Sequence, residues 1–421
     1  MKIRVLLFLV FAIAGAQAAR ASGPVVADPA SVGMSADGLE ALRAHFQHYV
    51  DEGKLSGLTT LVARKGVVVH FETYGQADKQ AGKAVADDAI FRIYSMTKPV
   101  TGVGLMMLWE EGKFKLDDPV AKYIPAFADA RVFKAQGEDG TVETVPANRQ
   151  ITIRDLMRHT AGLTYGVFGD TPVDKLYQKN GVLEAGLSVE EWMGRLAAQP
   201  LLYQPGDAWV YSFAVDVQGR LIEILSGQPL DVYFRERIFK PLGMKDTGFY
   251  ISNEQAKRLV TMYQVKKEEG LVPTSDPYFP DFTKKPSNFS GGGGLVSSTI
   301  DYWRFAQMVA NGGELDGVRL LQEETVALMS RDHLPERVNG IAGGKRGLGF
   351  GLDFAVVKDV AKQGGYGSVG EFFWGGMANT IFWIDPKEEV VALLMTNILP
   401  SNVYPLRPEM HKYVYEAIEA D

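Results

Sequence analysis

The sequence predicts an α+β protein in which strands from both ends of the chain form one antiparallel sheet flanked by helices. Two observations support this fold class: hairpin-like runs stand near the two ends of the chain, and the residues between them show mainly helical periodicity. Internal repeats of roughly 20–50 residues are absent, which argues against solenoids and propellers. We therefore expect a mainly helical insertion packed on the sheet, with an active site in the crevice between them.

The two hairpins define the predicted sheet. Residues 58–64 and 67–74 are rich in β-forming side chains and flank a two-residue Lys-Gly turn. Residues 380–384 and 390–395 repeat this pattern near the other end of the chain. Because each pair is joined by a short turn, its strands must run antiparallel, and we expect both pairs to join one sheet.

Helical spacing of apolar residues accounts for most of the remaining chain. The first predicted helix covers 39–50 behind the capping residue Ser35, and the last covers 407–418. Between the hairpins we predict helices over 100–109, 153–157, 189–198, 214–225, 230–239 and 302–309. Two long polar segments rich in glycine and proline, 165–187 and 252–290, are candidate lid loops over the crevice.

The first residues have the pattern of a secretory signal. Lys2 and Arg4 precede an almost wholly apolar run over 5–14, and Ala16-Gln17-Ala18 offers the small-x-small pattern of a signal-peptidase site. The apolar run is far shorter than the roughly 20 residues needed to span a bilayer. We therefore expect residues 1–18 to be removed, the mature chain to lack a membrane span, and the protein to be exported to the periplasm or the medium.

We expect residues 19–421 to form a single hydrolase domain with two parts. The α/β part should comprise residues of about 30–90 and 295–421, and the helical part residues of about 91–294. The segment 365–370 matches a dinucleotide fingerprint letter by letter. It lacks a preceding parallel strand and a following amphipathic helix, so it does not predict a cofactor site.

Composition excludes several function classes. The 421 residues carry a net charge of −7, which does not favour a nucleic-acid partner, and 46% hydrophobic with 23% charged residues is typical of a globular protein. The chain has no cysteine, so disulfides, thiolate nucleophiles and zinc ribbons are excluded. Neither Gly-x-Ser-x-Gly, a Walker loop nor His-Glu-x-x-His occurs. We expect no cofactor and no metal, and the oligomeric state stays open.

Ser95-Met96-Thr97-Lys98 is the strongest candidate for chemistry. A β-like run over 90–94 precedes it and an apolar helix follows, so Ser95 should lie at a helix N-terminus. Lys98, three residues later, would project from the same face of the helix. A lysine buried at such a position can act as a base toward the serine, although a serine cap with a surface lysine would give the same spacing.

Two further elements add weight to this interpretation. Tyr211 ends a loop and stands at the start of a predicted helix, where its phenol could exchange protons with Ser95. Trp374-Gly375-Gly376-Met377 places glycines at the entrance to a strand, where a substrate carbonyl could approach the backbone closely. A backbone N–H there, together with that of Ser95, could form an oxyanion hole.

The three motifs follow one another as Ser95-x-x-Lys98, Tyr211-Ser212-x and Trp374-Gly375-Gly376. This order resembles the penicillin-recognising serine hydrolases, and within them the family VIII esterases that are related to class C β-lactamases. The resemblance covers nearly the whole mature chain, and it implies a β-lactamase/transpeptidase-like fold. It also includes the stretches 151–163, 240–247 and 291–298, which we expect to be scaffold.

The resemblance implies a role for each site residue. Ser95 would be the acylated nucleophile, Lys98 and Tyr211 would share general base and acid work, and the N–H groups of Ser95 and Met377 would hold the oxyanion. Which of Lys98 and Tyr211 holds the proton at rest stays open. His159 would support the fold, because the family places lysine and tyrosine in the base role.

Two departures from the class C pattern bear on the substrate. The tyrosine motif there ends in asparagine and the third motif begins with lysine, whereas this chain has Phe213 and Trp374. Both replacements are apolar, so Phe213 and Trp374, with Gly375 and Gly376, should line a pocket for uncharged esters with short to medium acyl chains. A β-lactamase or D-amino-acid peptidase is the second interpretation and a transacylase the third. A non-catalytic binding protein is the alternative of a different class.

Overall fold

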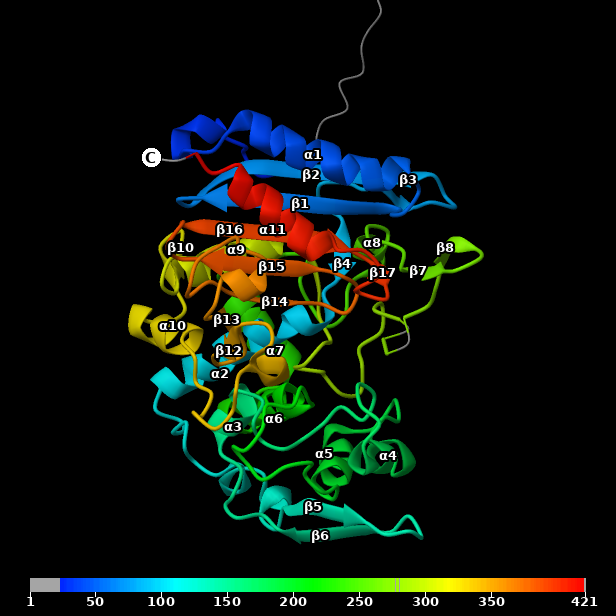
Figure 1. Cartoon of the computed structure of the whole chain (residues 1–421), viewed down its shortest axis with the longest axis vertical. Helices are drawn as coiled ribbons and strands as arrows, with labels where there is room; N and C mark the ends of the chain where they lie inside the picture. The colour runs from blue at the N-terminus through cyan, green and yellow to red at the C-terminus, as the bar shows by residue number, and fades with distance from the viewer. Residues whose placement is uncertain (1–22, 277, 280, 420–421) are drawn as a thin grey trace, which may run out of the picture.

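The computed structural model describes residues 23–276, 278–279 and 281–419, so the predicted signal peptide lies outside the described residues. An eight-stranded antiparallel sheet forms the upper half of the molecule in Figure 1. Its strands follow the spatial order β12 (Leu348–Phe350), β13 (Ala355–Val357), β14 (Phe372–Gly375), β15 (Ile381–Asp385), β16 (Val390–Thr396), β1 (Gly57–Arg64), β2 (Val67–Asp78) and β3 (Lys83–Ala84). The predicted α+β fold class is confirmed.

The two ends of the chain meet at the centre of this sheet. Strand β1 pairs with β2 in the first predicted hairpin and with β16 of the second, in a register that places Leu58 opposite Thr396. Every residue of β1 is buried, because helices cover both faces of the sheet there. The sheet therefore holds together segments that are almost a whole chain length apart.

Three helices sandwich the sheet. Helices α1 (Ala36–Asp51) and α11 (Leu406–Glu416) pack side by side on one face, and α9 (Thr299–Ala310) packs on the other against β1, β15 and β16 (Figure 1). Ser35 caps α1 through the N–H of Gly38, as expected from the sequence. These contacts produce an apolar core on each side of the sheet.

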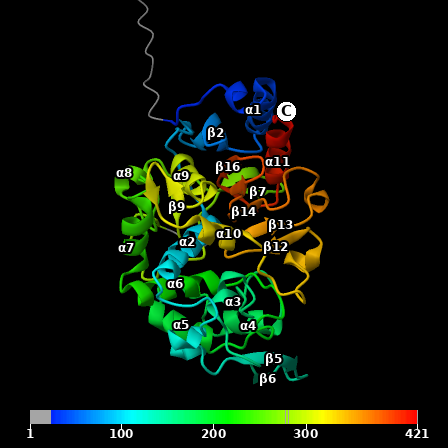
Figure 2. The ribbon, with the colours of Figure 1, turned by 90° about the vertical axis from the view of Figure 1, so that its left-hand side faces the viewer.

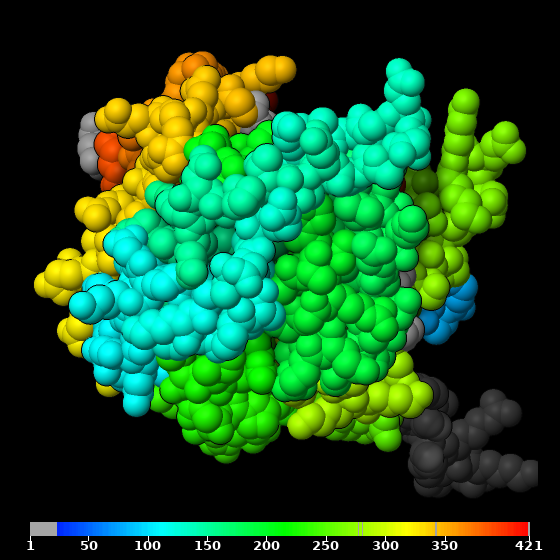
Figure 3. Space-filling model, turned by 90° about the horizontal axis from the view of Figure 1, so that it is seen from below, coloured from blue at the N-terminus to red at the C-terminus, as the bar shows by residue number. Residues whose placement is uncertain are grey.

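The remaining helices are coloured cyan to yellow in Figures 1 and 2. They are α2 (Thr97–Glu110), α3 (Ile153–Met157), α4 (Pro172–Lys179), α5 (Val189–Ala197), α6 (Ala214–Ser226), α7 (Leu230–Phe234), α8 (Asn253–Ala256) and α10 (Glu323–Ser330). In these figures α3 to α6 lie below the sheet, and α8 and α10 lie beside it. Helices α2 and α6 are in contact, and both are almost fully buried along their central turns. Seen from below, segments coloured cyan to green form most of the surface (Figure 3).

The two candidate lid segments contain more regular structure than we expected. The segment 165–187 includes α4, which starts at a capping box formed by Thr171 and Asp174. The segment 252–290 includes α8 and the hairpin of β7 (Tyr263–Lys266) and β8 (Gly270–Pro273). Reading both segments as loops was therefore wrong: α4 buries Val173 and Tyr177 at helical spacing, a pattern of two turns that is easily overlooked in a polar segment.

Smaller strand pairs complete the fold. Strands β5 (Arg131–Gln136) and β6 (Val142–Pro146) form an exposed hairpin at the bottom of Figure 1, whereas β4 (Ile90–Arg92) pairs with β9 (Val296–Ser298) in a separate two-stranded sheet. The predicted helix over 230–239 is α7 followed by a π-helical turn at Arg235–Phe239. In the described part of the chain, no helix is long and apolar enough to cross a membrane.

Candidate active site

Ser95 stands between a strand and a helix, as the sequence predicts. Strand β4 leads into a single 3₁₀ turn, Tyr94–Met96, and α2 begins at the next residue. Tyr94 has a φ of 42°, a left-handed conformation that a bulky residue rarely adopts. Its buried phenol donates to Asp276 Oδ2 at 2.7 Å. This bond anchors the turn immediately before Ser95.

The structure brings the three predicted reacting side chains together. Tyr211 Oη lies 2.6 Å from Ser95 Oγ, and Lys98 Nζ lies 3.2 Å from the same oxygen. Lys98 Nζ also lies 4.6 Å from the centroid of the Tyr211 ring. A nucleophile with two proton-exchanging groups within hydrogen-bond reach is the arrangement that covalent catalysis requires.

Lys98 is held by uncharged partners. Its side chain is 1% exposed, and Nζ donates to Tyr165 Oη at 2.8 Å and to Gly292 O at 2.6 Å as well as to Ser95. Gly292 comes from the glycine cluster that precedes β9. A Cβ atom there would lie 2.4 Å from Asp216 Oδ2, so only glycine allows this close approach.

Tyr165 is a site residue that the sequence analysis missed. It was placed only as the first residue of a candidate lid loop, and no local pattern distinguishes it from other loop aromatics. Burial raises the pKa of the Tyr165 phenol well above its ordinary value, so the phenol stays protonated across the working range of pH. It can therefore orient Lys98 without itself exchanging the proton.

Aromatic rings surround Tyr211. Their centroids lie 5.1–6.0 Å from that of Tyr211, and they belong to His159, Tyr165, Phe168, Trp209 and Trp374. Trp374 Nε1 donates to Tyr211 Oη at 3.4 Å. Phe168 is 63% exposed, so this ring offers an apolar face to solvent at the edge of the cluster. Phe213 extends the cluster, with its ring 4.5 Å from Tyr165.

Three buried titratable groups surround the lysine without contacting Ser95. Burial raises the pKa of Asp216 and of Asp353, and the positive charge of Lys98 opposes both shifts. Burial and the same charge lower the pKa of His159, which is neutral at pH 7. His159 Nδ1 pairs with Ser212 Oγ at 3.2 Å. The imidazole thus supports the loop before α6, in line with the structural role expected for it.

The third motif ends strand β14 beside the nucleophile turn. A Cβ atom at Gly376 would lie 2.5 Å from Ile93 O, and one at Gly375 would lie 2.8 Å from Thr380 O. Met377 packs in one apolar cluster with Tyr94, the residue before Ser95. Both glycines are therefore required by close backbone contacts. They bring the Met377 end of the strand next to the turn that carries Ser95.

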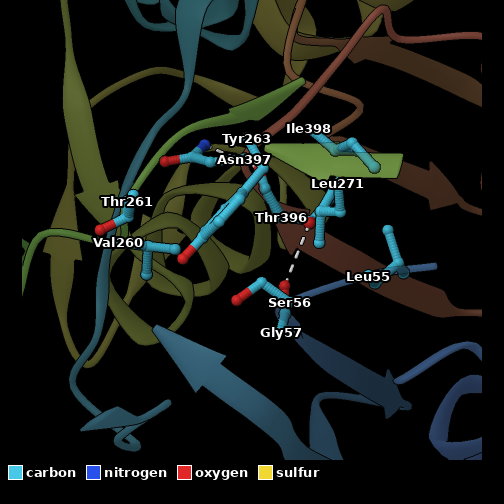
Figure 4. Close-up of a pocket in the computed structure, with 10 residues that line it drawn as sticks. All are labelled: Leu55, Ser56, Gly57, Val260, Thr261, Tyr263, Leu271, Thr396, Asn397 and Ile398. Atoms are coloured by element: carbon cyan, nitrogen blue, oxygen red, sulfur yellow. Dashed lines mark hydrogen bonds between the residues drawn. The ribbon is translucent and has the colours of Figure 1, made fainter. Parts of the chain in front are cut away.

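Two other hollows lie away from this site. One of about 320 Å³ is lined by residues 128–131, 146–147 and 149–150, none of which is a predicted site residue. The cavity in Figure 4 has a volume of about 10 Å³, roughly the space of one water molecule, and Ser56 and Tyr263 are among its lining residues. Thr396 donates to the Gly57 carbonyl across it. None of the predicted site residues lines it. Within the described ranges, no three His, Asp or Glu side chains gather closely enough to hold a metal ion.

Comparison with known proteins places this geometry in context. The family model described as Beta-lactamase matches residues 42–412. Esterase EstB of Burkholderia gladioli is 31% identical over 389 residues, which cover 88% of this chain and 93% of that protein. Protein Rv1367c of Mycobacterium tuberculosis is 36% identical over 370 residues, covering 86% and 90%. A putative D-alanyl-D-alanine carboxypeptidase of Escherichia coli is 26% identical, covering 94% and 90%.

Solved structures agree with these relatives. EstCE1, a hydrolase with promiscuous acyltransferase activity, superposes with a TM-score of 0.76 at 28% identity and covers 90% of this chain and 99% of its own. Simvastatin synthase from Aspergillus terreus has a TM-score of 0.79 at 23% identity, with 91% and 98% covered, and shows the shared fold. The predicted resemblance and the predicted fold are thus confirmed.

Proposed function

The chain belongs to the beta-lactamase family of serine hydrolases, and we propose that it is an exported carboxylesterase acting on uncharged esters with short to medium acyl chains. The observation that carries the proposal is the contact of Ser95 Oγ with both Lys98 Nζ and Tyr211 Oη. The relatives named as esterases support the reaction class. Export is supported by the signal-like pattern in residues 1–18.

The reaction begins with proton transfer from Ser95. The Lys98–Tyr211 pair accepts the hydroxyl proton as Ser95 Oγ forms a bond to the ester carbonyl carbon. The same pair returns the proton to the leaving alkoxide, and the C–O bond of the ester breaks to give an acyl-enzyme and a free alcohol. Water then repeats the sequence on the acyl-enzyme and releases the carboxylic acid. Tyr165 holds Lys98 in place during both halves.

Backbone N–H groups of Ser95 and Met377 stabilise the negative oxygen that develops in each half. The packing of Met377 in one apolar cluster with Tyr94 supports this pairing, since it places the end of β14 next to the turn that carries Ser95. Donors fixed by the backbone need no reorganisation during the reaction, and removal of one such donor typically costs a factor of about 10²–10³ in rate.

The substrate class follows from the walls of the site. Phe213 and Trp374 stand where a β-lactam-binding enzyme would have an amide and an ammonium group, and their rings join the aromatic cluster around Tyr211. An apolar wall offers no partner to a substrate carboxylate, whose desolvation would then be uncompensated. Uncharged esters avoid this cost.

The experiment that tests the proposal is the initial rate of the mature protein on p-nitrophenyl butyrate, with Ser95→Ala alongside. We expect turnover that falls by at least about 10³-fold in Ser95→Ala. Ser56→Ala, a buried serine at the cavity of Figure 4, is the matched control and should keep the wild-type rate. Equal turnover in wild type and Ser95→Ala would reject this nucleophile.

Two further measurements separate the alternatives. Turnover of a chromogenic cephalosporin or of a D-alanyl-D-alanine peptide, without ester turnover, would replace the esterase proposal by the β-lactamase or peptidase alternative.

For export, N-terminal sequencing of protein expressed with its full N-terminus should give a mature chain that starts at Ala19. An intact Met1 on the recovered protein would reject cleavage.

A further inference from the structure

Arg407 reaches the third motif from the far side of the sheet. It is the second residue of α11, and its Nη2 donates to the carbonyl oxygen of Gly376. Its Nε is buried and has no acceptor among the described residues. A cation in the first turn of a helix opposes the helix dipole, so an arginine at this position lowers the stability of α11.

The contact adds to the reason that the first position of the motif is glycine. A Cβ atom at Gly375 would lie 2.8 Å from Thr380 O and 2.9 Å from the guanidinium carbon of Arg407, so a side chain there would meet both the backbone and the arginine. The space on the Cβ side of Gly375 is thus already filled.

The carbonyl that Arg407 binds belongs to the peptide unit that supplies the Met377 N–H. This peptide is planar and trans, so its C=O and N–H point in opposite directions. Gly376 O also accepts the N–H of Asn379 at 3.2 Å, which closes a turn directly after the strand. Two donors on the oxygen therefore fix the direction of the N–H on the other side of the peptide.

We propose that Arg407 is a positioning residue for the oxyanion hole, acting through the Gly376 carbonyl to aim and polarise the N–H of Met377. This inference rests on the proposed function of the site. A charged donor on the carbonyl draws electron density through the amide and strengthens the N–H as a donor in turn. Burial lowers the pKa of the Arg407 guanidinium to about 10, so it still carries its positive charge at neutral pH.

The test compares Arg407→Met and Arg407→Lys with a matched control. Arg64→Met removes another buried guanidinium that donates to backbone carbonyls, here those of Val32 and Gly33, at the end of the central strand β1. For each protein we would measure kcat and KM on p-nitrophenyl butyrate, and the rate of Ser95 labelling by a fluorophosphonate. In that labelling Ser95 Oγ bonds to phosphorus, fluoride leaves, and the Lys98–Tyr211 pair takes the proton.

We expect Arg407→Met to lower both kcat and the labelling rate by about 10–100-fold, with KM within about threefold of wild type. Arg407→Lys should recover part of both rates, because an ammonium can still donate to the carbonyl. Arg64→Met should keep both rates within about threefold, whatever it does to the melting temperature. If Arg407 had a purely structural role, Arg407→Met and Arg64→Met would have similar effects on kcat and on the labelling rate.

Three outcomes would overturn the inference. One is an Arg407→Met protein that turns over and is labelled within threefold of wild type. If Arg407→Met does not fold by circular dichroism, Arg407→Gln, which removes the charge, decides in its place, and rates within threefold of wild type in that variant reject the inference. If wild type is labelled but hydrolyses no ester, the proposed function fails while the labelling rates still decide the role of Arg407. Absence of labelling at Ser95 in wild type overturns both.

Discussion

The two sides of Ser95 are built differently. On the helical side, side chains carry out the work: Lys98 and Tyr211 contact the nucleophile directly, and Tyr165 holds the lysine. On the sheet side, the backbone at the end of β14 lies close to the nucleophile turn, and the Gly376 carbonyl accepts a hydrogen bond from Arg407. In the proposed mechanism the first side moves protons and the second provides fixed dipoles.

The difference shows which side can vary. Side chains on the helical side are packed rings, one of which, Phe168, is 63% exposed, so substitutions there alter the wall of the site without moving the backbone. The sheet side leaves no room for a Cβ atom at Gly375 or Gly376. We therefore expect substrate range to depend on the aromatic cluster, to which the helical side contributes most rings and β14 contributes Trp374, and the transition-state geometry to depend on the backbone of the sheet side.

The largest expected effect on kcat lies on the helical side, where two tyrosines that both contact the site should respond differently to loss of their hydroxyl groups. Tyr211→Phe removes the hydroxyl 2.6 Å from Ser95 Oγ while keeping the ring in its cluster, and should lower kcat by about 10²–10⁴-fold. Tyr165→Phe removes a hydroxyl that contacts Lys98 and should cost only about tenfold. Steady-state kinetics on one ester would check both, and equal losses would contradict the division between proton transfer and positioning.

A smaller effect is expected from the exposed ring. Phe168→Ala removes an apolar face beside Tyr211, so KM for esters with longer acyl chains should rise about 3–10-fold with kcat within about twofold. Tyr203→Ala, another exposed aromatic residue, is the control and should change neither constant. A loss confined to kcat would place Phe168 in the chemistry rather than in the substrate wall.

The smallest effect on activity is expected at His70, far from the site. This residue should instead have a clear effect on stability. Burial lowers the pKa of His70 to about 4, against an ordinary value near 6.5. Between these values the unfolded chain binds a proton that the folded protein does not, so stability falls as pH falls from 6.5 to 4, by at most about 3 kcal/mol.

Urea unfolding of wild type and His70→Gln at pH 7, 6 and 5 checks this expectation. Burial raises the pKa of Asp301 to about 6. The contribution of Asp301 to the free energy of unfolding therefore falls as pH rises, opposite to the contribution of His70. Asp301 is present in both proteins, so the difference between them isolates His70. We expect the variant to show the shallower decline toward acid pH and an unchanged kcat at pH 7. If the free energies of unfolding of the two proteins declined in parallel as pH falls, His70 would not be the source of this pH dependence.

Much of this fold follows from local patterns, because both hairpins and most of the long helices have strong periodicity. Ser95, Lys98 and Tyr211 stand at the starts of helices, a position that a serine cap or a packed aromatic residue would also occupy. The order of the three motifs, which resembles the penicillin-recognising serine hydrolases, is what identified them. Tyr165 could not be predicted, because its position depends on a segment whose path is set by tertiary contacts. Arg407 left one usable signal: a basic residue opening a helix conflicts with the helix dipole, and such local conflicts are common at functional positions.

The pairing of β1 with β16 has a consequence for how the protein is made. Ser95 leaves the ribosome long before Gly376 and Arg407 exist, and the sheet that joins them cannot close until the last strands are available. A chain that emerges from its N-terminus therefore carries its nucleophile without an oxyanion hole for nearly all of synthesis. In the proposed mechanism, activity would switch on only when the chain is almost complete, so nascent and C-terminally truncated chains would be catalytically silent.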